Sequence, residues 1–137
     1  MTGIVIVTHC QLGQALIDAV EFILDKQPES LIAISININE NAAKLRKKLE
    51  SGIKSVKTQE GVLILTDMFG GTPSNLAYSF LEEGRVEVIS GVNLPMLIKA
   101  VSARKDMKLI KLAECLESYG KRSISLASGI LKGNKRT

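Results

Sequence analysis

Short continuous apolar runs alternate along the chain with longer stretches that have helical spacing. Four apolar runs have the length of buried strands: Gly3–Val7, Leu31–Ile38, Gly61–Thr66 and Val86–Ser90. Strands that are buried on both faces read as continuous apolar runs, and this is typical of parallel sheets covered by helices. The pattern therefore predicts four parallel strands at the centre of the fold.

Amphipathic stretches separate these runs and predict helices. In Gln11–Lys26, apolar side chains recur every three or four residues along one side. Similar spacing or capping residues mark four more stretches: Asn39 or Asn41 to Glu50, Pro73 to about Glu83, Leu94–Ala103 and Met107–Tyr119. The order of the elements predicts a doubly wound α/β fold, a mostly parallel sheet of four strands flanked by helices on both faces.

The chain beyond Gly120 has a less regular pattern. Polar and apolar residues alternate over Ser123–Leu126, which favours a half-exposed strand, although Ile124, Ala127 and Leu131 also fit helical spacing. We predict an antiparallel edge strand here, which has to pair with a sheet edge of its own chain or of a neighbour. One domain then covers residues 1–131, and residues 132–137 form a basic flexible tail.

Composition supports one domain and excludes some partners. The length of 137 residues fits a single domain. Aromatic residues make up only 4% of the chain, so there is little on which the bases of a nucleic acid could stack. The formal net charge is +4, a modest excess that a solvated helix face and the tail explain. We therefore expect no nucleic-acid partner.

Cysteine, histidine and apolar content limit the cofactors and the compartment. Cys10 and Cys115 form no disulfide or metal-binding pattern, and one histidine cannot complete a His-rich cluster. We expect no metal and no other cofactor. The chain has no signal-peptide pattern and no apolar stretch near the roughly 18 residues that span a bilayer. The expected location is the reducing cytoplasm.

The only histidine, His9, follows the first apolar run with Thr8 between them, and Asp67 directly follows the third run. Parallel strands end at one edge of a sheet, so both side chains are expected at the carboxyl edge, where open α/β folds bind ligands. A carboxylate that holds one imidazole nitrogen leaves the other nitrogen available as a nucleophile or base. His9 and Asp67 are therefore the candidate catalytic pair; the alternatives are packing for His9 and turn capping for Asp67.

The segment after Asp67 has the features of an anion-binding turn. Gly70 and Gly71 allow a tight turn with exposed N–H groups, and a helix that begins at Thr72 and Pro73 favours an anion such as phosphate at its N-terminus. We predict Gly70, Gly71 and Thr72 as phosphoryl-binding residues. An ordinary loop and helix cap would explain each of these residues separately. Their position at the same sheet edge as the catalytic pair favours a catalytic site.

Three motifs together indicate a family, and the second and third of them are quite specific. They are Val-Thr-His-Cys at 7–10, Thr-Asp-Met-Phe-Gly-Gly-Thr-Pro-Ser-Asn at 66–75 and Ser-Gly-Val-Asn-Leu-Pro-Met-Leu at 90–97. Across essentially the whole chain, the sequence resembles the IIA component of the mannose-type sugar phosphotransferase system. The resemblance implies a cytoplasmic phosphotransferase that takes a phosphoryl group from the histidine-containing phosphocarrier protein. It passes the group to a IIB component, which phosphorylates sugar entering through membrane IIC and IID partners.

The resemblance also implies roles for individual positions. His9 matches the phosphorylated histidine, Asp67 its orienting carboxylate, and Thr72 a small hydroxyl residue that contacts the phosphoryl group. Cys10 is a departure, because family members commonly have glycine after the histidine. The family further implies a homodimer in which the last strand crosses to the sheet of the partner.

A site that two protein partners use has to be shallow and partly exposed, so a rim of apolar residues could dock them. The candidates for this rim are Met68, Phe69, Leu94 and Met96, and Asn93 is a further candidate for contact with the partners. Asn93 and Leu94 fall in the loop that the family places beside its site. For Leu94 and Met96, burial in the core is an equal expectation.

Three other functions fit parts of the pattern. A response-regulator receiver also has an aspartate after its third strand, but it needs an acidic pair after the first, where this chain has Thr-His-Cys at 8–10. A hydrolase could use His9 and Asp67 as base and orienting group, with Thr72, Ser74 or Cys10 as nucleophile. A regulatory module could respond to phosphorylation without serving a transporter.

Overall fold

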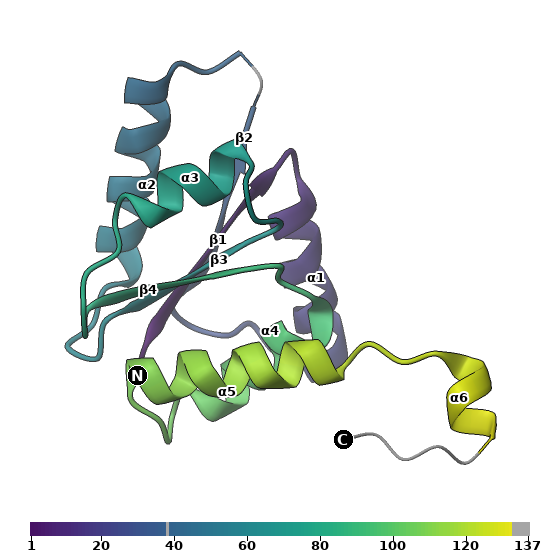
Figure 1. The fold of residues 1–137 in the computed structure, drawn as a ribbon. Coiled ribbons are helices and arrows are strands. Elements are labelled where there is room, and N and C mark those ends of the chain that lie inside the picture. Colours follow the sequence, from purple (N-terminus) through teal and green to yellow (C-terminus); the bar gives the residue numbers. More distant parts are fainter. Residues whose placement is uncertain (38, 133–137) are drawn as a thin grey trace.

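A parallel sheet of four strands lies at the centre of the fold (Figure 1). The computed structural model describes residues 1–37 and 39–132. The strands are β1 (Gly3–His9), β2 (Leu31–Ile36), β3 (Val62–Thr66) and β4 (Val86–Ser90), in the spatial order β2-β1-β3-β4. The predicted doubly wound sheet is therefore confirmed.

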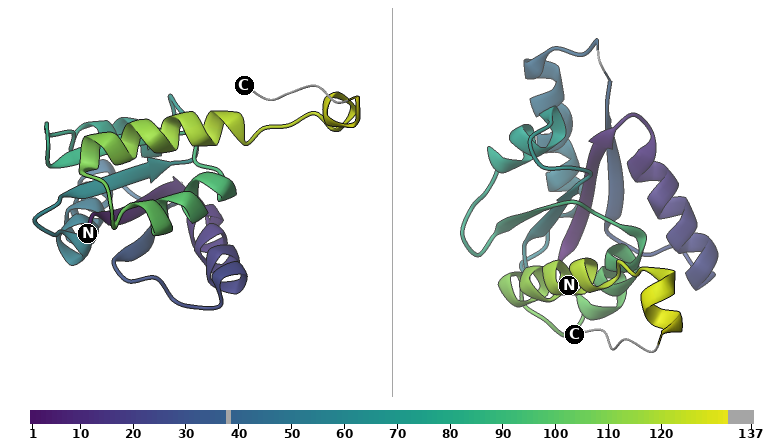
Figure 2. Two further views of the ribbon diagram at one scale, coloured as in Figure 1. Left: turned by 90° about the horizontal axis from the view of Figure 1, so that it is seen from below. Right: turned by 45° about the vertical axis from the view of Figure 1, so that its right-hand side comes forward.

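Helices cover both faces of the sheet, as Figures 1 and 2 show. One face carries α1 (Leu12–Leu24), α4 (Leu94–Ala103) and α5 (Leu109–Arg122), and the other carries α2 (Ala42–Val56) and α3 (Thr72–Tyr78). Successive side chains of a strand point to opposite faces, so Ile4 and Ile6 of β1 belong to the first core, and Val5 and Val7 belong to the second. This burial on both faces explains the continuous apolar runs.

Two helices end well away from their predicted ends, whereas α1 and α5 differ less, ending at Leu24 and Arg122. α2 continues past Glu50 to Val56, because Ile53 and Val56 extend its buried side. The prediction that the third helix reaches Glu83 was wrong, since α3 ends at Tyr78. The next turn is tighter, with the N–H of Leu81 donating to the carbonyl of Tyr78 at 3.1 Å. Leu81 is 56% exposed, so a longer helix would bury little apolar surface there.

The predicted strand Ser123–Leu126 is not a strand in this structure. The segment runs outward from the end of α5 to a short helix, α6 (Ala127–Leu131), which stands away from the sheet (Figure 1; Figure 2, left). A strand requires a neighbouring strand for its backbone hydrogen bonds, and this segment leaves the sheet of its own chain. Of the predicted tail, Lys132 is described and residues 133–137 lie outside the described part of the chain.

None of the helices in residues 1–37 and 39–132 is both long enough and apolar enough to cross a membrane.

Candidate functional site

His9 and Asp67 lie side by side at the carboxyl edge of the sheet. His9 is the last residue of β1, and Asp67 directly follows β3, the neighbouring strand. From β1 the chain continues to β2 on one side, whereas from β3 it continues to β4 on the other side. The pair therefore lies at the point where the strand order reverses, which is where open α/β sheets bind ligands.

The carboxylate of Asp67 holds the ring of His9 from one side. Its Oδ2 accepts a hydrogen bond from the backbone N–H of His9 at 3.0 Å and lies 2.8 Å from the ring Nδ1. An ionised carboxylate can only accept, so Nδ1 carries the proton of this contact. The side chain of Asp67 is 11% exposed and that of His9 is 48% exposed. The arrangement leaves Nε2 as the unprotonated nitrogen of a neutral ring.

The environment of Asp67 favours its ionised form. Burial alone would raise its pKa, but the hydrogen bonds from the ring and the backbone of His9, together with the charge of a protonated ring, outweigh burial and lower the pKa below its ordinary value. A lowered pKa in the folded state adds stability above the unfolded pKa of about 3.9. That stability is lost as the pH falls through the folded pKa.

The backbone of Gly71 lies close to the ring of His9. A Cβ atom at Gly71 would lie 3.0 Å from Cε1 and 3.4 Å from Nε2 of that ring, which is tighter than ordinary van der Waals contact. Gly70 has a φ of +89°, a conformation that favours glycine. Thr72, the first residue of α3, is exposed, and Gly71 precedes it with extended backbone. The structure thus brings the glycine turn and the start of α3 to the side of the ring that carries Nε2.

The predicted docking rim is only partly exposed. Met68 and Phe69, in the loop after Asp67, are 54% and 73% exposed. Of the two expectations for Met96, exposure on the rim and burial in the core, the structure shows burial, because Met96 is 3% exposed and packs under α5. A Cβ atom at Gly120 would lie 2.6 Å from its terminal methyl carbon. The absence of a side chain at Gly120 allows Met96 to be buried there.

Asn93 and Leu94 serve the fold rather than an exposed rim. The side chain of Asn93 accepts a hydrogen bond from the N–H of Met96 at 2.9 Å, which caps α4, and donates to the carbonyl of Gly120 at 3.1 Å. Leu94 packs against the core on that face. Of the five candidates, Met68 and Phe69 are therefore the ones whose apolar side chains are largely exposed.

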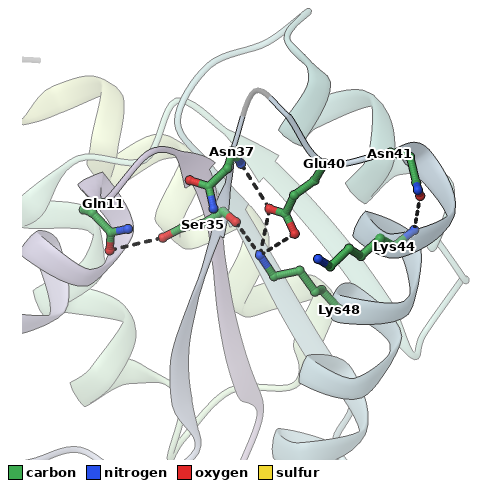
Figure 3. Close-up of polar contacts among 7 residues, drawn as sticks. All are labelled: Gln11, Ser35, Asn37, Glu40, Asn41, Lys44 and Lys48. Carbon is green, nitrogen blue, oxygen red and sulfur yellow. Dashed lines mark hydrogen bonds and ion pairs between the residues drawn. The ribbon is translucent and has the colours of Figure 1, made fainter.

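A polar cluster at the carboxyl end of β2 joins this strand to α2 through Ser35, Glu40 and Lys48 (Figure 3). His9 is paired in register with Ile36, so the loop that follows β2 starts beside it. Lys48 donates to both carboxylate oxygens of Glu40, at 3.0 and 3.1 Å, and to the carbonyl of Ser35 at 3.0 Å. The hydrogen bond from Lys48 lowers the pKa of Glu40. These contacts hold Glu40 to Lys48 of α2 and Lys48 to the end of β2.

Cys10 adopts a strained backbone conformation next to His9. Its φ is +50°, in the left-handed region that residues with a Cβ atom rarely adopt, and the cysteine is exposed. We expect Cys10→Gly to raise the free energy of unfolding by about 1 kcal/mol, because glycine adopts this conformation without strain. Urea unfolding measures the change. Cys10→Ser keeps the Cβ atom and should show no gain, and equal gains in both variants would contradict the explanation.

The structure argues against one form of the hydrolase alternative. Ser74 is fully buried, and its hydroxyl lies 3.1 Å from that of Ser90, so it cannot act as an exposed nucleophile. Within residues 1–37 and 39–132, no three His, Cys, Asp or Glu side chains gather in a way that could hold a metal ion.

A set of hydroxyl residues behind the site was not predicted from the sequence. Thr8 is fully buried and accepts a hydrogen bond from the N–H of Gly13 at 2.8 Å, which helps to satisfy the first turn of α1. Thr66 and Ser90 make further hydroxyl contacts. Each of these three residues is a polar residue near the carboxyl end of an otherwise apolar strand, and that position was the signal available in the sequence.

The fold and this geometry define an open α/β domain with an accessible, carboxylate-held histidine at its switch point. The chain belongs to the mannose-type family of IIA components of the sugar phosphotransferase system (PTS), because the family model described as "PTS system fructose IIA component" (EIIA-man) matches residues 3–117. The family predicted from the three motifs is therefore confirmed, and the protein is a IIA phosphotransferase component.

Individual relatives agree with this assignment. The chain is 32% identical to the fructose-specific EIIA component of Bacillus subtilis (strain 168), over 93% of this chain and 88% of the relative. It is 38% identical to the mannose-specific EIIAB component of Escherichia coli (strain K12), over 76% of this chain but only 32% of that longer relative. The crystal structure of the EIIA component from Streptococcus agalactiae has a TM-score of 0.83 and 26% identity, and the match covers 93% of this chain and 98% of that one.

Proposed function

We propose that this protein is a cytoplasmic phosphoryl carrier that accepts a phosphoryl group on His9 from the histidine-containing phosphocarrier protein. It passes the group to a IIB component, which serves sugar uptake through the membrane IIC and IID partners. The observation that carries the proposal is the 2.8 Å contact between His9 Nδ1 and Asp67 Oδ2. This contact leaves Nε2 unprotonated in a half-exposed ring, where a partner protein can reach it.

The transfer requires positioning and charge stabilisation, because the phosphoryl group passes through a loose, metaphosphate-like transition state. Nε2 of His9 forms a bond to phosphorus as the bond between phosphorus and the donor nitrogen breaks. The proton on Nδ1 stays in its hydrogen bond to Asp67, and the carboxylate offsets the positive charge that the ring gains. In the second transfer, the Nε2–phosphorus bond breaks as the nucleophile of the IIB component attacks.

The turn over the ring binds the phosphoryl oxygens in this proposal. The N–H groups around Gly70, Gly71 and Thr72 are the donors, and the hydroxyl of Thr72 adds a further contact. The position of Gly71 against the Nε2 side of the ring supports this assignment. A helix N-terminus also favours an anion, because its first N–H groups have no partner within the helix. Met68 and Phe69 provide the apolar surface on which both partners dock.

Phosphorylation in a reconstituted system tests the function. The protein is incubated with labelled phosphoenolpyruvate, the general phosphotransferase enzyme and the phosphocarrier protein, and a IIB component is then added. We expect labelling that saturates at one phosphate per chain, is acid-labile and base-stable, and is lost to the IIB component. Base-labile label would indicate an aspartyl phosphate, and retention of the label in the presence of the IIB component would favour a purely regulatory module.

We further propose that two copies form a homodimer in which the segment Ser123–Leu126 pairs with β4 of the partner. β4 is an edge strand of the sheet. A groove of about 500 Å³ lies beside it, lined in part by Ser90, Ile110 and Gly120. The side chains of Ile124 and Leu126 are 79% and 76% exposed, which is unfavourable for a monomer in water. An exposed sheet edge and an exposed apolar segment are complementary surfaces for strand addition.

Mass in solution tests the dimer. Light scattering coupled to size exclusion should give twice the chain mass of 14.8 kDa for the unmodified protein. Leu126→Asp should give the monomer mass, because a charge would be buried against the partner. The control is Phe22→Asp, which changes an apolar side chain that is 87% exposed on α1 and should leave the dimer intact. A monomer mass for the unmodified protein would rule the dimer out.

A further inference from the structure

Four hydroxyl groups meet behind the glycine turn, with Ser90 at their centre. The hydroxyl of Thr66 donates to Oγ of Ser90 at 2.9 Å. Oγ of Ser74 and the hydroxyl oxygen of Tyr78 lie 3.1 and 3.0 Å from the same atom. A serine hydroxyl has one proton and two lone pairs, so three partners use its full hydrogen-bonding capacity. Thr66 and Ser74 are fully buried, so water does not replace these contacts without a rearrangement.

The hydrogen bonds of this cluster join the two ends of the loop that carries the site. Thr66 is the last residue of β3 and directly precedes Asp67, whereas Ser74 lies in the first turn of α3, just after the glycine turn. Both are bonded to the same oxygen of Ser90. Ser90 therefore connects the two ends of this loop. At one end, Asp67 holds His9, and near the other end, Gly71 lies against the ring of His9.

Ser90 is itself held in place by the backbone. The N–H groups of Gly91 and Val92 both donate to the carbonyl of Thr66, each at 2.9 Å. These bonds fix the end of β4 to the end of β3. The hydroxyl of Ser90 thus extends from a rigid part of the sheet toward α3.

α3 is short and packs against the sheet through a small apolar surface. It spans only Thr72–Tyr78, which is too short to be a stable helix by itself, and its buried residues are Pro73, Ser74 and Ala77. A small apolar contact surface restrains translation weakly, because burial is not directional. Hydrogen bonds from Ser74 and Tyr78, one helical turn apart, set the position of the helix more sharply.

We propose that Ser90 is a positioning residue for phosphoryl transfer, and that its hydroxyl fixes the distance between Asp67 and the Gly71–Thr72 turn across the ring of His9. The inference rests on the proposed function of His9. In this proposal, Ser90 does not contact the phosphoryl group. Small errors in the position of reacting groups have large effects on rate, and a shift of about 1 Å can cost about 10²-fold.

The test compares variants that remove or keep the hydroxyl. In single-turnover phosphorylation at saturating phosphocarrier, Ser90→Ala should lower the rate constant about tenfold. Ser90→Thr, which keeps the hydroxyl, should restore most of the rate. Ser102→Ala is the matched control, because Ser102 is exposed on α4 and donates only within its own helix, to the carbonyl of Lys99 at 3.1 Å. The control should transfer at the unmodified rate.

A second substitution separates the shared cluster from a general loss of packing. Thr66→Val removes the other end of one hydrogen bond without changing the size of the side chain. If the hydroxyls of Thr66 and Ser90 act by joining the same two loop ends, the double variant that combines Thr66→Val with Ser90→Ala should transfer no more slowly than Ser90→Ala alone. Multiplicative losses would overturn the inference, as would an unmodified rate in Ser90→Ala or equal losses in Ser90→Ala and Ser90→Thr.

Amide hydrogen exchange decides the inference independently of phosphorylation. In Ser90→Ala, the N–H groups of residues 67–72 and of Ser74 should exchange about tenfold faster than in Ser102→Ala, while those of Ile4–Val7 in β1 should be unchanged. If the unmodified protein takes up no phosphate, the proposed function fails, and this measurement alone decides the role of Ser90. Unchanged exchange in residues 67–72 and Ser74 would overturn it.

Discussion

Replacing His9 with alanine is expected to abolish phosphorylation of this protein by the phosphocarrier. His9 is the only histidine in the chain, so no other side chain can form an acid-labile, base-stable phosphohistidine. Removal of the nucleophile should lower the rate of labelling by on the order of 10³-fold or more. Phosphorylation with labelled phosphoenolpyruvate, followed by quantification of label per chain, measures the loss.

The loss in His9→Ala can be separated from a loss of folding. The side chain of His9 is 48% exposed, and Asp67 keeps its hydrogen bonds from the backbone N–H groups of His9 and Met68, at 3.0 Å each. We therefore expect an unfolding transition close to that of the unmodified protein. His9→Gln, which keeps a donor near Asp67 but has no nucleophilic nitrogen, should be equally unlabelled. Label that persists in either variant would place the acceptor elsewhere.

Removing the carboxylate of Asp67 is expected to slow the transfer without abolishing it. Asp67→Ala leaves Nε2 in place but frees the ring to rotate and removes the charge that offsets the phosphorylated ring. The rate constant at saturating phosphocarrier should fall about 10²-fold. Asp67→Asn can still accept a hydrogen bond from Nδ1 but carries no charge, so its rate should lie between those of Asp67→Ala and the unmodified protein. Unchanged kinetics in Asp67→Ala would exclude Asp67 from the mechanism.

The pH dependence of unfolding gives a second measure of Asp67. Its pKa is lowered in the folded state, so its ionisation adds stability above the unfolded pKa of about 3.9. Asp67→Asn should therefore be less stable than the unmodified protein at neutral pH. The difference should shrink as the pH falls through the folded pKa, where the carboxyl group becomes protonated. A difference that stays constant down to pH 2 would show that the pKa of Asp67 is not lowered.

The sheet was predictable because its strands are buried on both faces. A strand such as β1, whose residues Ile4–Val7 have no exposed surface, can only be apolar throughout, and this requirement is visible in the sequence. The end of such a run is also visible, which is why His9 and Asp67 could be assigned to one edge. The end of α3 was not predictable, because helical spacing continues past Tyr78 although no core surface lies beneath Leu81.

Leu126 and Met96 show where the sequence pattern is ambiguous. The alternation over Ser123–Leu126 fits a strand, but whether it forms one depends on a partner strand that this chain does not place beside it. Met96 fits either an exposed rim or a core, and the choice depends on Gly120, which leaves room for it from another helix. In both cases the deciding contact lies outside the local segment.

The sequence by itself determined the parallel sheet, the position of His9 and Asp67 at its carboxyl edge, and the family. These follow from local patterns of burial and from short motifs. The tertiary structure alone decided that Asp67 holds Nδ1 at 2.8 Å, that Gly71 lies against the ring, and that Ser90 joins both ends of the loop. Such distances depend on how β3, β4 and α3 pack, because residues 58 positions apart meet only when the sheet has formed.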